Sequence, residues 1–184
     1  MKSIFTQKLA GKTVLLRVDL NSSIVEGRVV VSSRIREHAK TVYSLCEDGA
    51  KVVVLSHQGR KGDADFIPLK RHSDFIKKFT GRAVKFVTWQ EDFGKKIREM
   101  KNGEVVVMDN TRFLEIETDE KKTPEEFAAA KPIKELIDVS DFFVQDALSI
   151  SHRSNATVVG PPFKLKSFVG PVLERELGAM KKLN

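Results

Sequence analysis

Arginine side chains recur in this 184-residue sequence at or just after the ends of short apolar runs, beside small polar residues. The segments are Arg17-Val18-Asp19-Leu20-Asn21, Ser56-His57-Gln58-Gly59-Arg60, Asp109-Asn110-Thr111-Arg112 and, after Gln145-Asp146, Ser151-His152-Arg153. A guanidinium group binds phosphate or carboxylate through two parallel hydrogen bonds. Neighbouring Asp and Asn side chains accept from hydroxyl groups or orient the arginines. This chemistry predicts a site for a small ligand with several negative charges.

Five apolar runs precede these segments and have the composition of buried strands. They cover residues 13–19, 51–56, 83–87, 104–108 and 141–146. The runs are nearly continuous, which is typical of parallel strands covered on both faces.

Helical patterns separate the strands, at residues 35–46, 69–79, 93–100, 124–139 and 169–183. We expect Pro68 at the first position of its helix, and a kink or a second helix at Pro132. Residues 25–28 predict a hairpin turn. Alternating strands and helices predict an α/β fold, a single domain with a three-layer α/β/α, doubly wound (Rossmann-like) parallel sheet.

Ligands of such sheets bind outside the carboxyl ends of the strands. Four of the five predicted strands end in the segments above, and Ser33-Arg34 opens the first long helix at the same edge. The residues expected to converge are Asp19, Asn21, Arg34, His57, Arg60, Arg112 and Arg153.

Each residue taken alone also has a structural interpretation. A single arginine after a strand commonly pairs with a carboxylate such as Asp19 or Asp146, and His57 alone is typical of a turn. We interpret His38 and His72 as structural, and Cys46 as core packing. Four strand ends with the same chemistry favour the functional interpretation.

Other classes of site have no signature here. The sequence contains no G-x-x-x-x-G-K-[ST] segment, no dinucleotide fingerprint, no zinc-ligand spacing and no G-x-S-x-G elbow. We therefore expect neither a metal nor a nucleotide site on this chain.

The net charge of +7 suits an anionic partner, either a phosphorylated small molecule or nucleic acid. No aromatic residues are interleaved with the basic ones, which argues against a nucleic-acid module. The longest apolar runs fall far below the roughly 18 residues of a membrane span. The single cysteine, Cys46, fits a reducing cytoplasm. An anion sensor or a nucleic-acid-binding module without catalysis is the alternative.

The segments together resemble phosphoglycerate kinase. Residues 12–21 match its R-x-D-x-N signature, followed in order by Ser33-Arg34, Ser56-His57-Gln58-Gly59-Arg60, Asn110-Thr111-Arg112, Asp146-Ala147 and Ser151-His152-Arg153. The spelling is closest to archaeal members, and the resemblance covers essentially the whole chain.

The resemblance implies the N-terminal half of a two-domain kinase that transfers phosphoryl between ATP and 3-phosphoglycerate, giving 1,3-bisphosphoglycerate. Residues 1–168 would form the substrate-binding domain and 169–184 the start of the interdomain helix. The C-terminal domain, with the Mg-ATP or Mg-ADP site, would be absent. The implied protein is a cytoplasmic monomer, and the isolated chain would bind substrate weakly and be inactive.

Carried over by motif, Arg34 is the catalytic residue. The implied substrate-binding residues are Asp19, Asn21, Arg34, His57, Gly59, Arg60, Arg112 and Arg153. The sequence departs from the family pattern at Ser23, Lys61, Gln145 and Leu148-Ser149. We expect these departures to alter loop shape more than the arginines.

Overall fold

The computed structural model describes residues 2–119 and 121–182. Within them, parallel strands form one sheet in the order β5-β6-β4-β1-β7-β8. Their bounds are β1 (Thr13–Arg17), β4 (Lys51–Leu55), β5 (Val84–Val87), β6 (Val105–Met108), β7 (Phe142–Gln145) and β8 (Lys166–Val169).

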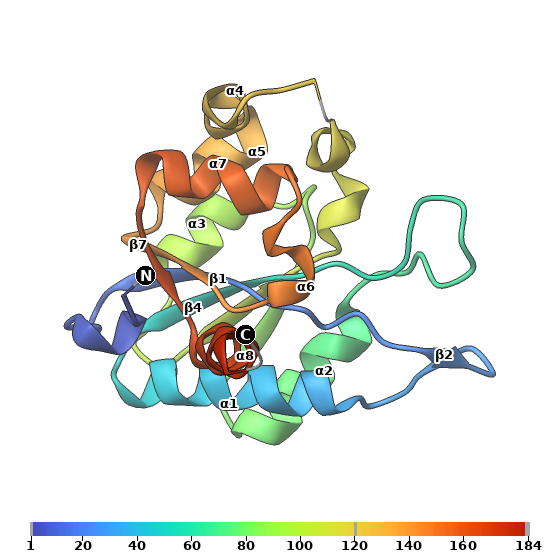
Figure 1. The fold of residues 1–184 in the computed structure, drawn as a ribbon, viewed down its shortest axis with the longest axis horizontal. Helices are drawn as coiled ribbons and strands as arrows, with labels where there is room; N and C mark the ends of the chain where they lie inside the picture. Colours follow the sequence, from blue (N-terminus) through green and yellow to red (C-terminus); the bar gives the residue numbers. More distant parts are fainter. Residues whose placement is uncertain (1, 120, 183–184) are drawn as a thin grey trace.

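Helices cover both faces of the sheet (Figure 1). On one face lie α1 (Ser33–Glu47), α2 (Lys70–Thr80) and α8 (Pro171–Lys181); on the other lie α3 (Phe93–Arg98), α4 (Pro124–Ala129), α5 (Lys131–Asp138) and α7 (Ala156–Lys164). The predicted three-layer, doubly wound parallel sheet is confirmed. None of the helices in the described residues has the length and apolar content that crossing a membrane requires.

The continuous apolar runs arise because both faces of each central strand are buried. In β1, Val14 and Leu16 pack with residues of α1 such as Val42, whereas Leu15 between them packs on the opposite face with Ile97 of α3. Successive side chains of a strand point to opposite faces, so every position of β1 must be apolar or internally paired.

The sixth strand, β8, was not predicted. Lys166 and Ser167 are exposed, so this edge strand lacks a continuous apolar run. Val169 was assigned to the final helix, but it pairs with Gln145 of β7, and its N–H donates to the carbonyl of Lys2. The helix therefore begins at Pro171, after Gly170. Leu183, the end of the predicted pattern, lies outside the described residues.

Other differences have local causes. Pro68 is not the first helical residue: α2 begins at Lys70, because the N–H of Leu69 donates to Asp109 at 3.0 Å and holds the preceding turn. The short α6 (Leu148–Ser151) and α7 were not predicted; Pro161 and Pro162 lie inside α7. The second helix expected near Pro132 is confirmed as α5.

Three short 3₁₀ helices, η1 (Ile4–Thr6), η2 (Thr111–Phe113) and η3 (Glu115–Thr118), and a hairpin of β2 (Ile24–Val25) and β3 (Arg28–Val29) complete the described elements. The predicted hairpin turn is confirmed, with Glu26 and Gly27 both at positive φ, the backbone of a tight two-residue turn.

The sheet opens at the carboxyl ends of β1 and β7. The chain leaves β1 toward β4 through α1 on one face, and leaves β7 toward β8 through α6 and α7 (Figure 1). Loops that diverge at such a point leave a crevice for a ligand.

Gly170, which precedes α8, tests how closely that helix is seated. A Cβ atom on Gly170 would clash with Oδ1 of the buried Asp146, whereas one on Gly178 within α8 would meet nothing within 4 Å. We expect Gly170→Ala to lower the free energy of unfolding by about 1–3 kcal/mol, and Gly178→Ala to raise it by about 0.5–1 kcal/mol. Chemical denaturation measures both, and equal effects would contradict this seating of α8.

Candidate anion-binding site

A polar cavity of about 250 Å³ lies at the carboxyl edge of the sheet. It brings together all eight residues singled out in the sequence: Asp19, Asn21, Arg34, His57, Gly59, Arg60, Arg112 and Arg153. They come from the loops after β1, β4, β6 and β7 and from the first turn of α1. The cavity therefore joins segments up to 134 residues apart in the sequence, from Asp19 to Arg153.

Asp19 has both carboxylate oxygens engaged. Its Oδ1 accepts from the backbone N–H of Asn21 at 3.0 Å, and its Oδ2 accepts from Ser149 at 2.7 Å and from Arg34 at 3.1 Å. Burial alone raises the pKa of the Asp19 carboxyl, but the contacts around it, led by the hydrogen bond from Ser149, outweigh burial and lower the pKa. Asp19 is therefore a fixed carboxylate that orients Arg34.

Ser149 departs from the family pattern, and its effect differs from our expectation. We expected it to change the shape of the loop. Instead, its hydroxyl donates to Oδ2 of Asp19, the same oxygen that accepts from Arg34. The departure at Gln145 leaves its buried Oε1 without a hydrogen-bond partner within the described residues.

His57 is buried and held as a neutral imidazole. Arg17 can only donate, so its contact of 3.4 Å with Nδ1 makes Nδ1 the acceptor and places the ring proton on Nε2. Burial, then the charges of Arg17 and Arg112, lower the pKa of His57 to about 3. His57 thus presents an N–H donor to the cavity without adding another positive charge.

Arg17 is completely buried beneath the cavity, and sequence reasoning did not assign it a role. It donates to the carbonyls of Val18 and Leu55 and to Thr157 of α7, and it lies 3.7 Å from Glu117, which is also fully buried. Burial, more than offsetting the attraction of Glu117, lowers the pKa of Arg17 to about 10, so Arg17 remains charged at neutral pH. The buried pair links β1, η3 and α7 behind the ligand-facing residues.

The loop after β4 is shaped by backbone contacts that only glycine allows. Gly59 has φ +63°, and a Cβ there would lie 2.5 Å from the backbone of Asp65. Its N–H donates to Oδ1 of Asn21 at 3.0 Å, and its carbonyl accepts from Arg112. These contacts set the start of the loop that carries Arg60.

The arginines of the cavity repel one another. The pKa of Arg112 is lowered first by burial and then by the charges of Arg153 and Arg60. Asp63 and Asp65, which sequence reasoning missed, also line the cavity, and the charge of Asp65 offsets part of this repulsion at Arg112. An anionic ligand would relieve the repulsion.

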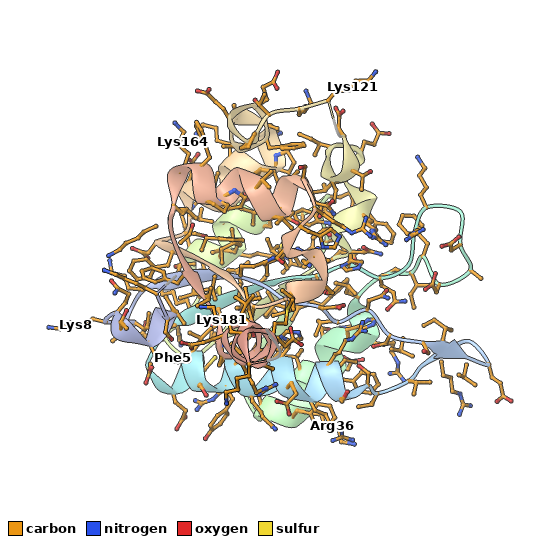
Figure 2. All side chains as sticks on the ribbon, in the orientation of Figure 1. Phe5, Lys8, Arg36, Lys121, Lys164 and Lys181 are labelled. Carbon is orange, nitrogen blue, oxygen red and sulfur yellow. The ribbon has the colours of Figure 1, made fainter. Side chains whose placement is uncertain are left out.

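Other basic side chains are spread around the periphery. Figure 2 shows Lys8, Arg36, Lys121 and Lys164 projecting outward from separate parts of the molecule. The net charge is therefore no evidence for one continuous basic surface. Within the described residues, no group of three or more His, Cys, Asp or Glu side chains could hold a metal ion.

The fold and this cavity define an α/β protein with a candidate anion-binding site at the switch point of its sheet. The family model "Phosphoglycerate kinase" matches residues 4–184, and the chain belongs to that family.

Known proteins agree with this assignment. The phosphoglycerate kinase of Pyrobaculum aerophilum is 41% identical over 172 residues, which cover 92% of this chain and 42% of that protein. That of Archaeoglobus fulgidus is 39% identical over 94% of this chain. The crystal structure of the phosphoglycerate kinase from Pyrococcus horikoshii aligns with a TM-score of 0.92 at 31% identity, covering 99% of this chain and 45% of that one.

The chain thus spans about 42% of the length of the curated relatives it matches. The alternative of an anion sensor or a nucleic-acid-binding module receives no support from these matches.

Breaking the buried Arg17–Glu117 pair should lower the free energy of unfolding far more than breaking an exposed ion pair. We expect Glu117→Gln to lower the free energy of unfolding by about 3–5 kcal/mol, because it leaves a buried guanidinium uncompensated. The matched control, Asp138→Asn, removes the carboxylate of an exposed pair with Lys134 and should change it by less than about 1 kcal/mol. Urea denaturation compares the two; similar losses would contradict the role given to the buried pair.

Two buried histidines should make stability depend on pH. The two are His57, whose pKa is lowered to about 3, and His72, whose pKa burial lowers to about 4. In the unfolded chain both histidines titrate near 6.5. As the pH falls below 6.5, the unfolded chain binds these protons and the folded chain does not. Protonation therefore favours the unfolded chain, and the free energy of unfolding decreases from its value above pH 6.5 as the pH approaches 4. The free energy of unfolding should fall by up to about 1.4 kcal/mol per pH unit for each histidine. Denaturation between pH 7 and 5 measures the slope, and His72→Gln should reduce it; an unchanged slope would contradict the lowered pKa.

Proposed function

We propose that this chain is the 3-phosphoglycerate-binding half of a phosphoglycerate kinase. The single observation that carries the proposal is the cavity that brings four arginines, a neutral His57 and a fixed Asp19 to one edge of the sheet. The ligand has a phosphate at one end and a carboxylate at the other. A wall of guanidinium groups complements both anions, and Asp19 and Asn21 provide partners for its hydroxyl group.

The residues divide into two groups by their surroundings. Arg60, Arg112 and Arg153, with the Nε2–H of His57, would hold the phosphate. Asp19 and Asn21 would hold the hydroxyl group. Arg34 has a side chain 56% exposed and is anchored to Asp19, so it is free at its other donors to contact the transferring phosphoryl group.

The reaction needs no general base. The nucleophile is an oxygen of the substrate carboxylate, which is ionised at neutral pH. It forms a bond to the γ-phosphorus of ATP while the bond from that phosphorus to the ADP oxygen breaks. Positioning and positive charge then lower the barrier, and we assign to Arg34 the stabilisation of the transition state.

The nucleotide would be held outside this chain. The cavity does not fit Mg²⁺, because its three carboxylates lie among four arginines, whose charges repel a cation. In this proposal the substrate domain extends through β8 to Gly170, and α8, which begins at Pro171, leads to a nucleotide-binding domain. The full protein would be a cytoplasmic monomer, and this chain alone would bind substrate without transferring phosphoryl.

Binding of 3-phosphoglycerate to the chain tests the proposal. We expect Arg153→Gln to weaken the affinity by about 10- to 100-fold, the loss of a charge-assisted hydrogen-bonded pair. The control Arg71→Gln removes the same charge from an exposed side chain on α2 and should leave the affinity nearly unchanged. Isothermal titration calorimetry measures both. Wild-type protein that fails to bind at high millimolar ligand, or equal losses in both variants, would contradict the proposal.

Arg34 should affect turnover more than affinity. In the longer protein that the proposal implies, Arg34→Ala should reduce kcat by about 10³-fold or more with little change in the affinity for 3-phosphoglycerate. Steady-state kinetics and calorimetry separate the two quantities. A large loss of affinity at unchanged kcat would assign Arg34 to ground-state binding instead.

A further inference from the structure

His38 lies in α1, is almost completely buried, and is not part of the motifs that identify the family. Our sequence interpretation of it was purely structural. In the structure its two ring nitrogens contact two different acidic residues. Nδ1 lies 3.1 Å from Oδ2 of Asp146, and Nε2 accepts from the backbone N–H of Asp19 at 3.3 Å.

These two contacts fix the tautomer of the ring. A backbone N–H can only donate, so Nε2 must be unprotonated, and Nδ1 must carry the proton that is donated to Asp146. The neutral Nδ1–H form is the one that satisfies both neighbours. A ring protonated on Nε2 would place that N–H face to face with the N–H of Asp19.

Asp146 is anchored independently of His38. Its Oδ2 also accepts from Thr41 at 2.8 Å, and its Oδ1 accepts from the N–H groups of Val172 and Leu173 at 2.8 and 3.3 Å. The carboxylate thus occupies the first turn of α8, and α8 lies against α1 in Figure 1. The Asp146 carboxylate that accepts from His38 is therefore held in place by three other hydrogen bonds.

Asp19 is the residue that gains from this support. Its side chain is held by Ser149 and Arg34, but neither contact fixes its backbone. The backbone N–H of Asp19 donates to Nε2 of His38, and the next N–H, of Leu20, donates to Ser56. The hydrogen bond to His38 therefore holds the backbone of Asp19 itself, from which the side chain that orients Arg34 extends.

We propose that His38 is a positioning residue: supported by Asp146, it holds the backbone of Asp19 and thereby aligns Asp19 and Arg34 toward the anion cavity. The same contacts tie this turn to the start of α8. The effect on ligand affinity rests on the proposed function, whereas the hydrogen bond and its effect on the Asp19 backbone do not.

The tautomer provides a test that a merely space-filling histidine would fail. Nitrogen-resolved NMR of the chain without ligand should show His38 protonated on Nδ1, with a scalar coupling across the hydrogen bond between its Nε2 and the amide nitrogen of Asp19. A ring protonated on Nε2, or no coupling, would overturn the proposal.

Two variants of His38 separate its contacts. His38→Asn keeps an N–H directed at Asp146 but cannot reach Asp19, whereas His38→Gln can place a carbonyl oxygen near the Nε2 position. We expect amide exchange of Asp19 to accelerate about three- to tenfold in His38→Asn, and to return toward the wild-type rate in His38→Gln. Thr41→Val is the matched control, because it removes another hydrogen bond to Asp146 and should leave exchange at Asp19 unchanged.

Affinity for 3-phosphoglycerate adds a second measurement. It should fall by about three- to tenfold in folded His38→Asn, recover in His38→Gln and stay constant in Thr41→Val. Unchanged exchange and affinity in His38→Asn, or equal effects of all three variants, would overturn the positioning role. If the wild-type chain does not bind 3-phosphoglycerate, the proposed function fails, and the coupling and the exchange rates still decide the role of His38.

Discussion

The structure depends on a permanent positive charge buried at the end of its central strand. Arg17 cannot be neutralised at any ordinary pH and has no access to water, so each of its donors must meet an acceptor inside the protein. Those acceptors lie in the residue that follows β1, at the end of β4 and in the loop after it, in η3 and in α7. The hydrogen bonds that Arg17 requires therefore fix the elements that surround the polar cavity of the candidate site.

This scaffold allows the cavity to stay highly charged before a ligand arrives. Burial and the charge of Arg17 keep His57 neutral, and Arg17 orients its ring, which limits the positive charge near Arg60, Arg112 and Arg153. Asp19 holds Arg34 from the other side. Because these contacts are internal, the arginines need not be ordered by the ligand itself, and less conformational entropy is lost on binding.

The sequence was sufficient to predict the central strands, the layers and seven of the residues that line the cavity, because buried parallel strands leave continuous apolar runs and their carboxyl ends meet at one edge; Gly59 came only from the family resemblance. It could not predict β8, whose exposed Lys166 gives no apolar pattern, nor α7, whose Pro161 and Pro162 normally interrupt a helix. The roles of Arg17, Ser149 and His38 depend on contacts with residues more than 15 positions away in the sequence. The spacing of neighbouring residues does not predict such contacts.

The central claim is that the cavity is a preformed site for a phosphorylated carboxylate. NMR of the arginine side chains during a titration with 3-phosphoglycerate tests this claim most directly. The account predicts saturable shifts of the Arg34, Arg60, Arg112 and Arg153 guanidinium signals, with the backbone of β1 and β4 unmoved and Arg71 unaffected. Shifts that do not saturate, that include Arg71 equally, or that come with rearrangement of β1 and β4 would contradict it.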